Sequence, residues 1–136
     1  MSVAHKDVTG VWHGLYNYDF AQAPVYFVAT LLAGSNWLSG TSHEASEGSI
    51  GQALTLYATL EGSVAGDNVD FSKSYDGSGG WNHSVSYSGS LNPDGLEIEG
   101  TWHIKDVGFL PVSGRFLMIR SGGASEALVR KVYERA

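Results

Sequence analysis

The chain has 136 residues, a formal net charge of −6 and no cysteine. That length is enough for one domain with a buried core. The hydrophobic fraction of 43% argues against disorder, and the lack of cysteine excludes disulfides and thiolate zinc sites. The few basic residues are scattered along the chain, so no basic face for a nucleic acid is visible.

The first residues carry no apolar segment like that of a signal peptide, and no apolar run approaches the ~18 residues of a membrane helix. We therefore expect a soluble, cytoplasmic protein with neither a nucleic-acid nor a membrane partner. Glycine is frequent, at 18 residues, and clusters with serine between stretches of alternating polarity. This composition is typical of a protein made of many short strands and turns.

Polar and apolar residues alternate over most of the chain, which predicts strands with one face in a core. We predict eight strands, over residues 10–18, 24–32, 37–43, 52–64, 68–75, 82–91, 96–104 and 112–120. Short connections with turn residues, such as Asn92-Pro93-Asp94-Gly95, join most of them. Strands joined in this way pair antiparallel, and closure of the sheet removes its two unpaired edges. The predicted fold class is all-β, an eight-stranded antiparallel up-and-down barrel.

Two connections, 44–51 and 76–81, are longer than the others, and we expect them to form loops at the rim. The barrel is predicted over about 9–120, and the tail at about 124–135 has the apolar spacing of a short helix. We predict a single domain over 1–136.

An outward-facing apolar patch is predicted on the first and last strands, formed by Leu15, Leu117 and Ile119. Such a patch needs a cover, either the tail helix or a second subunit in a homo-oligomer.

Strand parity places aromatic and aliphatic side chains, with a few polar tips, inside the barrel. An eight-stranded barrel holds either a packed core or one small ligand, and buried polar groups need partners. We therefore predict a ligand pocket at one end of the lumen, entered between the connections 44–51 and 76–81. The candidate ligand-binding residues are Tyr16, Tyr18, Glu44, Phe71, Lys73, Tyr75, His83, Tyr87 and Trp102.

Lys73 is the most informative candidate, because it lies between two aromatic residues on an inward face. Either it binds an acidic ligand group or acts as a base, or its ammonium reaches solvent at the rim. His83 and Tyr87 are likewise either an acid–base pair or solvated rim residues. Glu44, at the edge of a loop, is expected to be solvated. Trp12 in Gly10-x-Trp12 is expected to plug one end of the barrel.

Several short motifs resemble the avidin/streptavidin family, within the wider calycin group of barrels. Thr9-Gly10-Val11-Trp12 resembles the family's opening Gly-x-Trp, and Leu38-Ser39-Gly40-Thr41 resembles its Leu-Thr-Gly-Thr strand. The segment 82–89, Asn-His-Ser-Val-Ser-Tyr-Ser-Gly, is similar to its sixth strand. Trp102 stands where the family has a tryptophan in its seventh strand. The resemblance covers 9 to about 120 in order. It implies the same barrel fold.

The residues by which this family holds biotin are not kept. The family's first-strand, third-strand and sixth-strand contacts fall at Gly14, Tyr18, Ser42, Glu44, His83, Val85 and Tyr87. Its last-strand aspartate has no counterpart, since 111–120 contains no acidic residue. The resemblance therefore implies the barrel with a different ligand or none, because biotin needs that preorganised polar set.

The sequence favours a small-molecule-binding barrel without catalysis, whose ligand is apolar or aromatic. One alternative is an enzyme with acid–base chemistry, like the isomerases, cyclases and decarboxylases among calycin-type barrels. Another is an oligomeric structural or interaction protein with a filled core. No catalytic residue is assigned, and neither zinc spacing nor a phosphate loop is present. Gly10-x-Trp12-x-Gly14 is also similar to nitrobindin-type haem barrels, but their histidine near the C-terminus is missing. The cofactor is therefore unknown.

Overall fold

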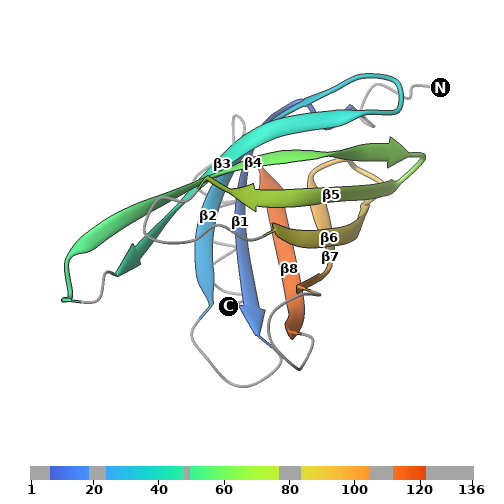
Figure 1. Ribbon diagram of the computed structural model, residues 1–136. Helices are drawn as coiled ribbons and strands as arrows, with labels where there is room; N and C mark the ends of the chain where they lie inside the picture. Colours follow the sequence, from blue (N-terminus) through green and yellow to red (C-terminus); the bar gives the residue numbers. More distant parts are fainter. Residues whose placement is uncertain (1–6, 19–23, 48–49, 77–83, 105–111, 122–136) are drawn as a thin grey trace.

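The computed structural model describes residues 7–18, 24–47, 50–76, 84–104 and 112–121 (Figure 1). These residues contain no helix long and apolar enough to cross a membrane. They form eight strands: β1 (Gly10–Tyr18), β2 (Val25–Ala33), β3 (Leu38–Glu47), β4 (Ala53–Ala65), β5 (Asn68–Tyr75), β6 (Ser84–Leu91), β7 (Glu97–Ile104) and β8 (Val112–Arg120).

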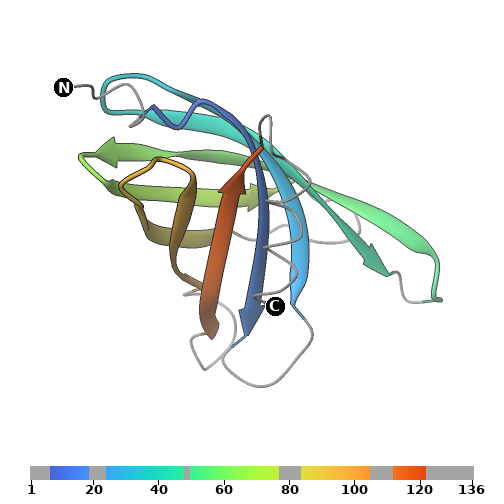
Figure 2. The same cartoon turned by 180° about the vertical axis from the view of Figure 1, so that it is seen from behind.

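Each strand pairs antiparallel with the next along the chain, and β8 pairs with β1 to close the barrel. The last and first strands run side by side in both ribbon views (Figures 1 and 2). The predicted all-β, eight-stranded up-and-down barrel is thereby confirmed. Closure leaves β1 and β8 without the unpaired edges that an open sheet of these strands would expose.

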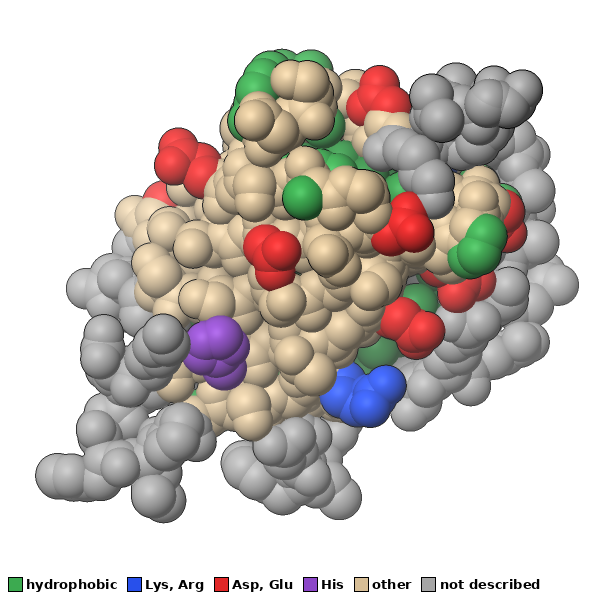
Figure 3. Space-filling view, turned by 90° about the vertical axis from the view of Figure 1, so that its right-hand side faces the viewer, with side chains coloured by type: hydrophobic (Ala, Val, Ile, Leu, Met, Phe, Trp, Pro, Cys, Tyr) green, Lys and Arg blue, Asp and Glu red, His purple; other side chains and the backbone are tan. Residues whose placement is uncertain are grey.

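Burial follows the period-2 pattern of the sequence. Along β5, every second residue from Val69 to Tyr75 is buried, while Asp70 and Ser72 are exposed. The inward side chains of all eight strands form one hydrophobic core cluster. On the face shown in Figure 3, the described surface is mainly backbone and uncharged, non-hydrophobic side chains, with scattered acidic and a few hydrophobic side chains.

One end of the barrel is closed by tight turns and by Trp12. The indole is fully buried, and its Nε1 donates a hydrogen bond to the Val8 carbonyl at 2.9 Å. The Arg120 guanidinium lies 4.5 Å from the centre of the ring and donates to the carbonyls of Thr9 and Gly95. The predicted plug is confirmed. The opposite end, where β1 ends and β8 begins, carries the longer connections 19–24, 48–52, 76–83 and 105–111.

The β3–β4 hairpin differs from the prediction, because β3 continues to Glu47 rather than ending at His43. Glu47 pairs with Ala53, so the first half of the expected loop 44–51 is strand. In β3 the residues after Glu44 have no pairing with β2, and the hairpin extends beyond its neighbours (Figures 1 and 2). The physical reason is the length of β4, since the first residues of this 13-residue strand give the extension of β3 an antiparallel pairing partner.

The outward apolar patch of β1 and β8 is buried. Leu15 and Leu117 are each 7% exposed and Ile119 is 0% exposed, and they form a second core cluster apart from the lumen. The predicted helix at about 124–135 lies outside the described residues. Whether the tail or a second subunit covers this patch therefore stays a prediction.

Candidate functional site

Four polar residues meet inside the barrel, toward the end with the longer connections. Tyr16 lies near the end of β1, Glu44 near the end of β3, and Lys73 and Tyr75 at the end of β5. All four are inward-facing and at most 9% exposed. Strand parity brings them together, because each occupies an inward position within a few residues of the same rim.

Glu44 is the centre of this cluster. Its Oε1 accepts hydrogen bonds from Lys73 Nζ at 2.8 Å and from the Tyr75 hydroxyl at 2.9 Å. Its Oε2 accepts one from the Tyr16 hydroxyl at 2.7 Å. A buried carboxylate needs both a counter-charge and hydrogen-bond donors, and this arrangement provides both.

Lys73 is enclosed by aromatic rings. Its Nζ lies 4.6 Å from the ring centre of Phe27, 5.0 Å from Tyr16, 5.2 Å from Tyr75 and 5.6 Å from Tyr87. Ring faces stabilise a cation at these distances. Burial lowers the pKa of the ammonium, and the Glu44 carboxylate opposes that shift. The lysine is therefore easier to deprotonate than a solvated one.

An ammonium has three N–H donors. Among the described residues, Glu44 is the single hydrogen-bond acceptor of Lys73. The remaining N–H donors of Lys73 therefore face the rings.

Burial, together with the neighbouring Glu44 and Tyr75 charges, raises the pKa of the Tyr16 hydroxyl. Tyr16 is therefore a neutral donor to the carboxylate over the whole physiological pH range.

A row of small side chains crosses the lumen wall beside this cluster. Ala29, Ser42 and Ala58 pair with one another across β2, β3 and β4, and all three are buried. The Ser42 hydroxyl has no hydrogen-bond partner within the described part of the chain. A buried hydroxyl without a partner costs about 1–3 kcal/mol. Among the described residues, the Ser42 hydroxyl is therefore a buried polar group with unused hydrogen-bonding capacity.

Aromatic residues form the rest of the wall. The Phe71 and Tyr87 rings stack at 4.9 Å with an interplanar angle of 9°, and Phe116 meets Tyr87 edge-on. Trp102 meets Tyr16 edge-on at 5.7 Å. An aromatic wall around one polar cluster is the lining expected for a ligand with an apolar body and one polar end.

The structure corrects two expectations from the sequence. Lys73 is 1% exposed, so the interpretation as a rim lysine whose ammonium reaches solvent is wrong. Glu44 is 4% exposed, so the expectation of a solvated loop residue is also wrong. Both errors have one cause, because β3 continues through Glu44 and brings a carboxylate to the lysine. The side chain of Tyr18 and the whole of His83 lie outside the described residues.

Sequence reasoning missed Phe27 and Ser42 as site residues. Phe27 is 2% exposed and lies over Gly14, where an added Cβ would be 2.3 Å from the ring. Ser42 was placed only as the counterpart of a family contact. The signal that would have identified it is parity, because Leu38, Gly40, Ser42 and Glu44 alternate along one face of β3.

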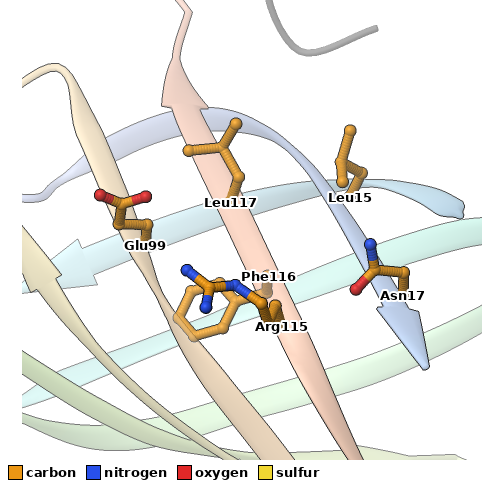
Figure 4. Close-up of a pocket in the computed structure, with 6 residues that line it drawn as sticks. All are labelled: Leu15, Asn17, Glu99, Arg115, Phe116 and Leu117. Atoms are coloured by element: carbon orange, nitrogen blue, oxygen red, sulfur yellow. The ribbon is translucent and has the colours of Figure 1, made fainter. Parts of the chain in front are cut away.

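A separate hollow of about 310 Å³ lies on the outer side of β7, β8 and β1. Leu15 and Leu117 line it together with Asn17, Glu99 and Arg115, and Figure 4 shows the Arg115 side chain between those of Glu99 and Asn17. Since these side chains point away from the lumen, the hollow is distinct from the buried polar cluster.

Within the described ranges, no three His, Cys, Asp or Glu side chains are grouped so that they could hold a metal ion. Comparison of the chain with protein-family models, with curated proteins and with solved structures found no match. The function of this chain is therefore inferred from the geometry of the site.

Proposed function

We propose that this protein binds a small apolar or aromatic molecule in the lumen of the barrel. The polar end of the ligand contacts Ser42 and the cluster of Tyr16, Glu44, Lys73 and Tyr75. The unpartnered Ser42 hydroxyl is the observation that carries the proposal. It is a buried polar group for which the described residues offer no hydrogen-bond partner, in a row of small residues.

The charge state of the cluster narrows the ligand class. Glu44 already occupies the position of an anion beside Lys73, at 2.8 Å. A carboxylate or phosphate ligand would compete with Glu44 and add a second negative charge to a buried site, which is unfavourable. The ligand is therefore uncharged, with a carbonyl, hydroxyl or amide at its polar end. This replaces the acidic ligand considered from the sequence.

We also propose that the barrel is related to the avidin-like calycins. The closed up-and-down order of eight strands supports this relationship, as do the motifs at Trp12 and Trp102. Biotin is not the ligand that we propose. The third-strand position of the biotin-holding serine is Glu44 here, and its carboxylate is already bound to Lys73 and two tyrosines.

The second candidate function is an enzyme that uses acid–base chemistry. The lowered pKa of Lys73, next to a carboxylate and two neutral hydroxyls, is the observation that favours it. The third, kept from the sequence, is an oligomer with a filled core; the outward patch at Leu117 and Ile119 does not favour it, because this patch is already buried within a single chain. The binding experiment below separates the first two from the third.

The test is a ligand screen monitored by tryptophan fluorescence, since Trp102 lies beside Tyr16 in the wall. The panel holds uncharged aromatic alcohols, aldehydes and amides, with the matching carboxylates. Ser42→Ala is compared with Ser88→Ala, the same change at an exposed outward position of β6.

For an uncharged ligand, we expect Ser42→Ala to weaken binding by about 2- to 12-fold, the loss of one hydrogen bond. Ser88→Ala should bind like the wild type. If both variants bind equally well, the ligand lies elsewhere, for example in the outer hollow at Arg115. If no compound binds, the filled-core interpretation is favoured.

A further inference from the structure

We propose that Lys73 is a carbonyl-reactive lysine, whose amine forms a reversible imine with an aldehyde or ketone group of a ligand in the lumen. This inference rests on the ligand binding proposed above and names its substrate class. It follows from the position of the amine, which is buried, held by a carboxylate and enclosed by aromatic rings.

The first requirement for imine formation is a neutral amine, because only the free lone pair attacks a carbonyl carbon. Glu44 Oε1, at 2.8 Å from Lys73 Nζ, is placed to take the proton. Burial favours this transfer, since it lowers the pKa of the ammonium. Lysines that form Schiff bases are typically desolvated in the same way.

The step balances without an oxidant or reductant. The nitrogen lone pair forms a C–N bond, the π electrons of the carbonyl move to oxygen, and that oxygen takes a proton. The carbinolamine then loses its hydroxyl group, with a second proton, as water. The products are a protonated imine on Lys73, one water molecule and the Glu44 carboxylate. The total charge is unchanged, because a protonated imine replaces the ammonium.

The surroundings stabilise this product as they stabilise the ammonium. The protonated imine keeps a positive charge beside Glu44, and the rings of Phe27 and Tyr87 are within 5.6 Å of the nitrogen position. Ser42 lies two residues before Glu44 on the same inward face of β3, and its hydroxyl, which has no competing partner among the described residues, can donate to the ligand. Exclusion of water from a site only 1% exposed slows hydrolysis of the imine.

The experiment uses benzaldehyde as the carbonyl probe and benzyl alcohol as its matched control, because the alcohol has similar size and no carbonyl. The full chain is incubated with benzaldehyde and cyanoborohydride, which reduces an imine to a stable secondary amine. Each modified residue gains the mass of the aldehyde less one oxygen atom. Peptide mapping then compares Lys73 with the chain's other lysines, Lys6, Lys105 and Lys131.

We expect the adduct on Lys73 to exceed that on each other lysine several-fold, because the lumen holds the aldehyde beside this amine. Lys73→Arg should keep the positive charge but give no adduct at position 73. If that variant fails to fold by near-ultraviolet circular dichroism, the double variant Lys73→Met with Glu44→Gln replaces it.

Two results would overturn the proposal in distinguishable ways. If both compounds change the tryptophan fluorescence but Lys73 is trapped no more than the other lysines, imine formation is refuted and ligand binding stands. If neither compound binds and no selective adduct forms, the carbonyl chemistry and the lumen site for such ligands are both refuted.

Discussion

Removal of one partner of the Glu44–Lys73 pair should destabilise the protein far more than removal of both. Glu44→Gln keeps the side-chain volume and an acceptor oxygen for the tyrosines, but leaves the 1% exposed ammonium without its counter-charge. A buried charge that loses its partner costs about 3–5 kcal/mol. Lys73→Met leaves a carboxylate that still accepts from two hydroxyls, at 2.7 and 2.9 Å. We therefore expect its cost at the lower end, about 3 kcal/mol.

The double variant Glu44→Gln with Lys73→Met contains no buried charge at this site, so its free energy of unfolding should lie within about 1 kcal/mol of the wild type. The assay is urea unfolding followed by tryptophan fluorescence. With a slope near 2 kcal/mol per M, each single variant lowers the midpoint by about 1.5–2.5 M. If the losses of unfolding free energy in the two single variants simply add up in the double variant, Glu44 and Lys73 do not form a buried ion pair.

Four further predictions concern the fold and its pH dependence. The raised pKa of Tyr16 means that the unfolding free energy falls as pH rises above about 10, where the unfolded phenol ionises; Tyr16→Phe should flatten this slope in urea titrations. Arg120→Lys should lower the free energy of unfolding by about 1–3 kcal/mol in the same urea titration. A lysine cannot make both the contact with the Trp12 ring and the hydrogen bonds to the carbonyls of Thr9 and Gly95. Gly114→Ala should lower the melting temperature, since its Cβ would lie 1.8 Å from the Asn17 carbonyl oxygen. Ile119→Ala should cost about 2–5 kcal/mol in calorimetry despite its outward position; a cost below about 0.5 kcal/mol would show that the outer patch is solvated.

The barrel could be predicted because the sequence signals that specify its strands and turns each lie within a short stretch of the chain. Alternation along 68–75 and 84–91, with turn residues between strands, sets both the strands and their inner faces. Closure follows from the same pattern, because eight antiparallel neighbours would otherwise leave two unpaired edges. Of the site, parity correctly placed Tyr16, Lys73 and Tyr75 in the lumen.

The ion pair itself was not predictable from those local signals. The polar segment after His43 has the composition of a loop, and only the pairing of β3 with the long β4 makes it a strand. Glu44 and Lys73 are 29 residues apart in the chain and lie on strands that are not neighbours in the sheet. Their contact depends on the curvature of the closed barrel, which a sequence pattern does not specify.

We propose that the lumen holds a small uncharged molecule beside Glu44, Lys73 and Ser42. The most direct measurement is native mass spectrometry of freshly purified protein, compared with its denatured mass. We expect a native mass that exceeds the polypeptide mass by one small molecule per chain. Equal native and denatured masses, unchanged after incubation with uncharged aromatic alcohols and aldehydes, would contradict it.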